Sequence, residues 1–67
     1  MGLLVRVNHP QPDGRNVCVT QHPNGCVTVG IHRGEAFLMD IILPPRYATD
    51  EDVEVATKQL LARTEGR

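Results

Sequence analysis

The sequence predicts an α+β fold, in which a four-stranded antiparallel β-meander is followed by one C-terminal α-helix packed on one face of the sheet (ββββα). Three observations predict it. Apolar and polar residues alternate through the first two-thirds of the chain, as they do in half-buried strands. Clusters of Gly, Pro, Asn and Asp separate the alternating segments. After Pro44 and Pro45, apolar residues recur at helical spacing. We expect residues 1–67 to form one small domain, with the sheet over residues 3–43 and the helix over about residues 49–64.

The first three strands are expected in LLVRV (3–7), NVCVT (16–20) and CVTVGIH (26–32). Their odd-numbered positions hold valine, leucine or isoleucine, so these side chains should share one face of the sheet. We predict that this face forms the core beneath Val53, Ala56 and Leu60 of the helix. Its members are Leu3, Val5, Val7, Val17, Val19, Val27, Val29 and Ile31.

The segment HPNGC (22–26) is typical of a type I turn followed by a glycine in the left-handed conformation. This loop pairs residue 22 with 26, 20 with 28 and 18 with 30. All the valines of the two strands then share one face, which supports the same register. We interpret the two His-Pro pairs, His9-Pro10 and His22-Pro23, as similar turn devices.

The fourth strand, within EAFLMDIIL (35–43), is apolar on both faces and is interrupted by Asp40. Such a strand is normally covered on both faces. A three-residue loop in HRGE (32–35) would leave Leu38 and Ile42 on the face away from the helix. The side chains directed toward the helix would then be Phe37, Met39, Ile41 and Leu43. A longer loop would reverse the two sets.

The helix is expected to begin after Thr49, which suits an N-cap, with Asp52 as its capping-box partner. Acidic residues in the first turn favour the same start. Gly66 is expected to stop the helix. One apolar stripe follows at helical spacing: Val53, Ala56, Leu60 and Leu61.

The formal net charge of −1 gives no overall field that would attract nucleic acid or an anionic membrane. The longest apolar stretch is short and broken by Asp40, so no transmembrane span is expected. The segment MGLLVRVN lacks the features of a signal peptide, and Arg6 stands where a myristoylation signal needs Ser or Thr. We therefore predict a cytoplasmic protein with reduced thiols and no membrane partner.

Two cysteines and two histidines share the face of the hairpin opposite the valines. Cys18 and Cys26 lie about 13 Å apart along the strands, beyond the reach of a disulfide of about 7 Å. His22 would face Cys26, and His32 would lie diagonal to Cys18. Each pair offers two ligands where zinc needs three or four, so no metal or cofactor is expected. A zinc site shared between two copies stays open as an alternative.

No enzymatic activity is expected, because the chain contains no serine and no third group that would complete a Cys-His pair. The paired carboxylates of DEDVE (50–54) are explained by the start of the helix.

The second apolar face of the sheet is the feature that points to a function, because an open apolar patch marks an interaction site. We expect a small non-enzymatic binding or regulatory protein, an inhibitor or adaptor of another protein of the kind that bacteria and phages encode. It would form a homodimer through the sheet face or a strand edge. The alternative is a nucleic-acid-binding module that uses the loop arginines in NHPQPDGR and HRGE, and a steep salt dependence would favour it. The candidate interface consists of Leu4, Leu38, Ile42, Arg6 and Arg33.

Overall fold

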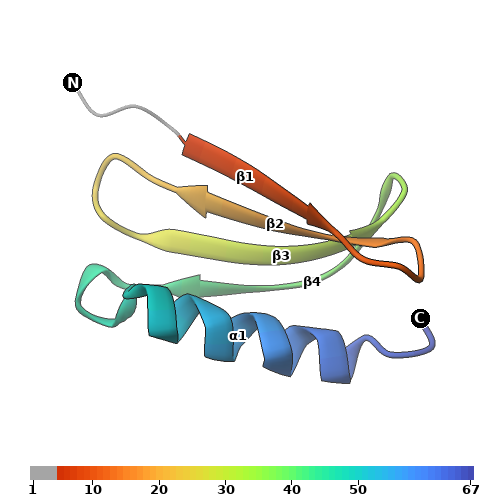
Figure 1. Ribbon diagram of the computed structural model, residues 1–67. Coiled ribbons are helices and arrows are strands. Elements are labelled where there is room, and N and C mark those ends of the chain that lie inside the picture. Colours follow the sequence, from red (N-terminus) through yellow and green to blue (C-terminus); the bar gives the residue numbers. More distant parts are fainter. Residues whose placement is uncertain (1–4) are drawn as a thin grey trace.

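The computed structural model describes residues 5–67, which form the predicted ββββα arrangement (Figure 1). The four strands are antiparallel and pair in the order β1-β2-β3-β4. Helix α1 lies across one face of this sheet (Figure 1). No helix within residues 5–67 is long and apolar enough to cross a membrane. The elements are β1 (Val5–Pro10), β2 (Arg15–Gln21), β3 (Val27–Arg33), β4 (Ala36–Leu43), the 3₁₀ turn η1 (Pro45–Tyr47) and α1 (Asp50–Arg63).

The first two hairpins close through the same five-residue turn, QPDGR (11–15) and HPNGC (22–26). In each turn the first residue's N–H donates to the fifth residue's carbonyl, over 2.7 Å and 2.9 Å. The side chain of Asp13 or Asn24 accepts from the backbone N–H two residues further on. Gly14 and Gly25 have φ angles of +95° and +93°, which glycine adopts without a steric penalty.

The repeated turn therefore depends on Pro-Asp-Gly and Pro-Asn-Gly, and the interpretation of both His-Pro pairs as turn devices is wrong for the first pair. His9 and Pro10 lie at the end of β1, opposite Val17 and Asn16 of β2. The type I turn with a left-handed glycine predicted for residues 22–26 is consistent with these bonds and with Gly25.

The predicted register of the β2–β3 hairpin is confirmed, since Cys18 lies opposite Gly30 and Thr20 opposite Thr28. This register divides the sheet into two faces. The face toward α1, which we call the helix face, carries the valines of β2 and β3. The other face, which we call the open face, carries Arg6, Asn8, Cys18, Thr20, Thr28, Gly30, His32, Phe37, Asp40 and Ile42.

A β-bulge in β4 changes the faces predicted for this strand. Ile31 lies opposite Met39, whereas the next residue, His32, lies opposite Phe37, so Leu38 has no direct partner. The turn itself has only two residues, Gly34 and Glu35, and Gly34 has φ +60° at the first central position, as in a type II′ turn.

Neither of the two loops considered from the sequence is therefore correct. The bulge leaves Met39, Ile41 and Leu43 on the helix face but moves Phe37 to the open face. Leu38 packs against the core, so its predicted place outside is wrong. Ile42 is on the open face and 66% exposed, as the three-residue loop predicted.

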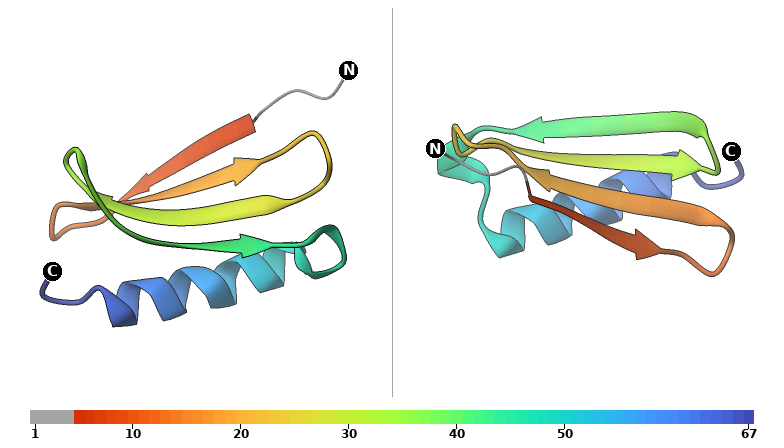
Figure 2. Two further views of the ribbon diagram at one scale, coloured as in Figure 1. Left: turned by 180° about the vertical axis from the view of Figure 1, so that it is seen from behind. Right: turned by 90° about the horizontal axis from the view of Figure 1, so that it is seen from above.

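The core lies between α1 and the strands nearest to it, β3 and β4 (Figure 2). An α-helix is about 10 Å wide and strands are about 4.8 Å apart, so one helix covers about two strands. Val5 and Val7 of β1 are consequently each 46% exposed, and their predicted burial is wrong. Leu3 lies outside the described residues. The buried apolar residues are Val17, Val27, Val29, Ile31, Ala56 and Leu60.

Helix α1 begins as predicted, with a capping box between Thr49 and Asp52. The Thr49 hydroxyl accepts from the Asp52 N–H at 3.1 Å, and the Asp52 carboxylate accepts from the Thr49 N–H at 3.3 Å. The helix ends at Arg63 with Thr64 as its C-cap, so Gly66 does not end it.

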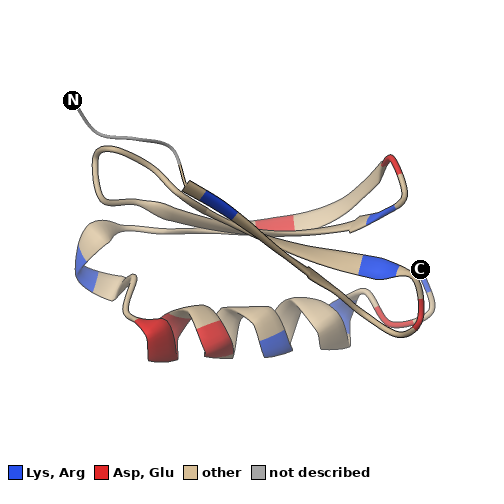
Figure 3. Cartoon of the chain, turned by 45° about the horizontal axis from the view of Figure 1, so that its top comes forward, with Lys and Arg blue, Asp and Glu red and all other residues tan. Residues whose placement is uncertain are grey.

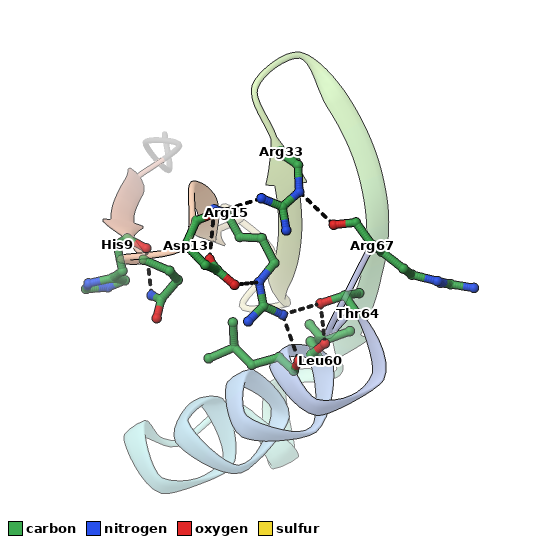
Figure 4. A network of polar contacts seen from close by, with 9 residues as sticks. His9, Asp13, Arg15, Arg33, Leu60, Thr64 and Arg67 are labelled. Atoms are coloured by element: carbon green, nitrogen blue, oxygen red, sulfur yellow. Dashed lines mark hydrogen bonds and ion pairs between the residues drawn. The ribbon is translucent and has the colours of Figure 1, made fainter.

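The C-terminal end of α1 is held to the first hairpin by a polar network, shown in Figure 4. The Arg15 guanidinium donates to the Leu61 carbonyl at 2.7 Å, to the Thr64 hydroxyl at 2.9 Å and to the Asp13 carboxylate at 2.7 Å. Arg33 donates to the carbonyls of Asp13 at 2.7 Å and Arg67 at 2.6 Å. We call Asp13, Arg15, Arg33, Thr64 and Arg67 the clasp.

The clasp should make stability sensitive to acid. The backbone N–H of Arg15, aided by its guanidinium, holds the pKa of Asp13 below its ordinary value. A carboxyl whose pKa falls on folding contributes stability above its unfolded pKa and loses it as the pH falls through the folded pKa. The variant Asp13→Asn should therefore lose less stability than the wild type when the pH falls below about 4. Urea midpoints at neutral and acidic pH measure this, with Glu35→Gln in the β3–β4 turn as the control. An equal loss of stability in acid for both variants would contradict it.

Candidate binding surface

The open face of the sheet is hollowed along its two central strands. On this face β2 and β3 present small residues, Cys18, Thr20, Thr28 and Gly30, whereas the edge strands present larger ones. Both ends of β3 curve away from α1, which makes the open face concave along the strands (Figures 1 and 2). The hollow, which we call the trough, has a volume of about 310 Å³. Its lining consists of Arg6, Cys18, Thr20, His22, Thr28, Gly30, His32, Phe37 and Asp40.

The two walls of the trough carry opposite charges. Arg6 is on β1 and Asp40 is on β4, and both are exposed. Three strand spacings, about 14 Å, separate them across the sheet, and an offset of two residues, about 7 Å, separates them along the strands, so their Cα atoms are about 16 Å apart. The floor between them is uncharged, so each charge is free to meet a complementary group of a bound molecule.

Gly30 keeps the floor low beside the acidic wall. A Cβ atom at this position would lie 3.6 Å from the His32 Nε2 atom and 3.7 Å from the Asp40 Cβ atom. Any larger side chain would therefore fill the space between His32 and Asp40. Glycine at this position leaves that space open.

The two histidines of the open face contact their neighbours. His22 Nε2 forms a hydrogen bond of 2.7 Å with the Thr28 hydroxyl, and the His32 ring meets the Phe37 ring edge-to-face at 5.5 Å. Cys18 and Cys26 are free thiols. Within residues 5–67, no three His, Cys, Asp or Glu side chains are grouped so that they could hold a metal ion. The zinc alternative would need ligands from a second copy.

The structure places two of the five candidate interface residues on the same face of the sheet. Arg6 and Ile42 stand at opposite ends of one cross-strand row, Arg6–Thr20–Thr28–Ile42, on the open face. Leu38 packs against the core, and Arg33 belongs to the clasp. Leu4 lies outside the described residues.

Of the trough residues, only Arg6 belongs to the candidate interface predicted from the sequence, and Phe37 and Asp40 are among those that are missing from it. Asp40 could have been found, because a carboxylate inside an apolar strand has to face solvent. Phe37 is 57% exposed, but it reaches the open face only through the β4 bulge.

A second open surface lies on the helix face, between α1 and the first two strands. This groove has a volume of about 320 Å³, and it includes Val19, Val53 and His9. The first turn of α1 adds a concentration of acidic side chains at one end (Figure 3). The half-exposed Val5 and Val7 belong to the same uncovered part of the sheet.

Comparisons with protein-family models, with curated proteins and with solved structures give no match to this chain. A function for the protein therefore has to be inferred from the chemistry and geometry of its own surfaces.

Proposed function

We propose that the protein is a small non-enzymatic binding protein, which acts in the cytoplasm as a homodimer and inhibits or adapts another protein through the open face of its sheet. The trough carries this proposal. It is a hollow with a floor of small side chains, one cationic wall and one acidic wall, bordered by the exposed apolar residues Phe37 and Ile42. Exposed apolar groups with a polar border are typical of protein interaction sites.

The trough suits an extended protein segment that crosses the strands. Arg6 would meet a carboxylate, and Asp40 would meet a lysine or arginine about 16 Å away. An extended chain advances about 3.3 Å per residue, so the two charges of the partner would be about five residues apart. Apolar side chains of the same segment would contact Phe37 and Ile42 at the acidic side.

The loop arginines give less support to a nucleic-acid partner. The Arg15 side chain is only 11% exposed and donates to Asp13, Leu61 and Thr64. Arg33 donates to two backbone carbonyls of the clasp. Phosphate contacts need free cationic donors. Using these two arginines for phosphate would release the end of α1.

Selection from a displayed library of random linear 12-residue peptides tests this proposal. Selected peptides should carry an acidic and a basic residue about five positions apart, with apolar residues beside the basic one. Arg6→Glu should weaken their binding about tenfold or more, because attraction becomes repulsion. Arg46→Glu, the same change in η1, is the control and should leave binding within about twofold.

The proposal fails if the library yields no binder. It also fails if the selected peptides lack this charge spacing, or if they bind the Arg6→Glu and Arg46→Glu variants equally well.

A further inference from the structure

The two edges of the sheet differ in how well they are protected against pairing with another strand. The edge strand β4 contains a bulge and a charged residue, Asp40, and Pro44 and Pro45 follow it directly. Bulges, charges and prolines are the devices by which proteins prevent edge pairing. Strand β1 also contains a charged residue, Arg6, and a proline, Pro10, but it pairs with β2 without a bulge, and all six of its residues are exposed. Its outer edge is the less protected one.

The turn that follows β1 determines which of its backbone groups point outward. Gln11 and Arg15 are hydrogen-bonded across the strands, and hydrogen-bonded pairs alternate along an antiparallel ladder. Val5, Val7 and His9 therefore direct their N–H and carbonyl groups toward β2. Arg6 and Asn8 direct theirs toward the open edge, as does the carbonyl of Pro10.

We propose that β1 pairs antiparallel with β1 of a second copy, with Arg6 of each copy opposite Asn8 of the other, so that the two sheets become one sheet of eight strands. This inference rests on the homodimer of the proposed function and names the surface that forms it. In this register the outward N–H and carbonyl groups of Arg6 and Asn8 are all paired. The dimer is isologous, as most protein dimers are.

The neighbouring registers are less favourable for reasons visible in the sequence of β1. Shifting the pairing toward the start of the strand places Arg6 opposite Arg6 of the other copy, and like charges directly opposite are destabilising. Shifting it the other way places Arg6 opposite Pro10, which has no N–H to donate. The register of Arg6 with Asn8 avoids both problems.

The proposed pairing also contacts the valines that α1 leaves uncovered. On the helix face, Val7 lies opposite Val7 of the second copy, and Val5 lies opposite His9. Both valines are 46% exposed in the single chain, and each gains a cross-strand neighbour. The two Arg6 side chains become diagonal neighbours about 7–8 Å apart, so physiological salt should favour the dimer by screening them.

Substitutions of Asn8 test the backbone pairing. Asn8→Pro removes an outward N–H but no bond to β2, and proline is tolerated on edge strands. Asn8→Ala keeps this N–H and is the matched control, because both changes remove the Asn8–Asn16 side-chain hydrogen bond of 3.1 Å. Sedimentation equilibrium in 150 mM salt should show dimers for the wild type and Asn8→Ala, and monomers for Asn8→Pro.

A cysteine cross-link tests the register even if Asn8→Pro does not fold. The test uses a chain in which Cys18→Ser and Cys26→Ser remove the native thiols. In that chain, position 7 of the variant Val7→Cys would lie opposite position 7 of the second copy, within the Cα distance that a disulfide spans. Oxidation should link this variant into dimers. The matched variant Val5→Cys should stay largely unlinked, because it faces His9 of the other copy.

A wild-type protein that stays monomeric up to about 100 μM, about a hundred times a typical micromolar Kd, would overturn the pairing. Dimers of folded Asn8→Pro, or equal cross-linking at positions 5 and 7, would overturn it too. A monomer that still selects peptides with the expected charge spacing would refute the β1 pairing and retain binding by the open face. A β1-paired dimer that selects no such peptides would support the β1 pairing and refute binding by the open face.

Discussion

Val29→Asp is expected to unfold the protein. Val29 is 0% exposed and lies on the helix face between Val19 of β2 and Ile41 of β4. It belongs to the same buried cluster as Ala56 and Leu60 of α1. A carboxylate without a partner in such a place costs several kcal/mol, whether it stays charged or takes up a proton. A domain of this size has a total stability of only about 3–10 kcal/mol. The variant should lose its cooperative thermal transition and its NMR chemical-shift dispersion at 25 °C.

Val55→Asp provides the matched control for this experiment. Val55 is 50% exposed on α1, so the same change should cost no more than about 1 kcal/mol through helix propensity and charge repulsion. A melting temperature of Val29→Asp close to that of the wild type would mean that the two faces of the sheet are wrongly assigned.

The sequence was informative where local chemistry decides the structure. The Pro-Asn-Gly turn determines the β2–β3 register, and the valines on one face agree with it, so the pairing of Cys18 with Gly30 could be predicted. The capping box of Thr49 and Asp52 is equally local. The same turn recurs as Pro-Asp-Gly in residues 12–14, and this repeat can also be recognised in the sequence. It would have placed Arg6 opposite Thr20, and hence in one row with Ile42.

The sequence was uninformative where packing between distant segments decides the structure. Alternation shows which side of a strand faces the core, but not how far one helix extends over the sheet. For this reason the exposure of Val5 and Val7 could not be predicted. The bulge at Leu38 lets this side chain pack against the core while Phe37 turns away, a choice that two adjacent apolar residues do not reveal. Besides the neighbouring Asp13, the partners of Arg15 are 46 and 49 residues away, so no local pattern identifies its role in holding α1.

Arg15→Met is expected to destabilise the protein by about 2–3 kcal/mol, because it removes three hydrogen bonds from a charged donor but keeps most of the side-chain volume. Two of these bonds hold the last turn of α1, at the Leu61 carbonyl and the Thr64 hydroxyl. Thr64 is 0% exposed, so water would not readily replace the lost donor. A change of 1 kcal/mol shifts the melting temperature of a small domain by about 4–8 °C. The melting temperature should therefore fall by about 10–20 °C.

Arg63→Met is the matched control for the loss of a positive charge at the same end of α1. Arg63 is exposed in the last turn, so only its favourable interaction with the helix dipole is lost, about 0.3–1 kcal/mol. Hydrogen exchange gives a second measurement. In Arg15→Met the amides of residues 60–64 should lose protection before those near Thr49, because the clasp holds only the C-terminal end of the helix. Equal melting temperatures of the Arg15→Met and Arg63→Met variants would show that the clasp contributes no more than a surface charge, and that α1 is held to the sheet by its apolar face alone.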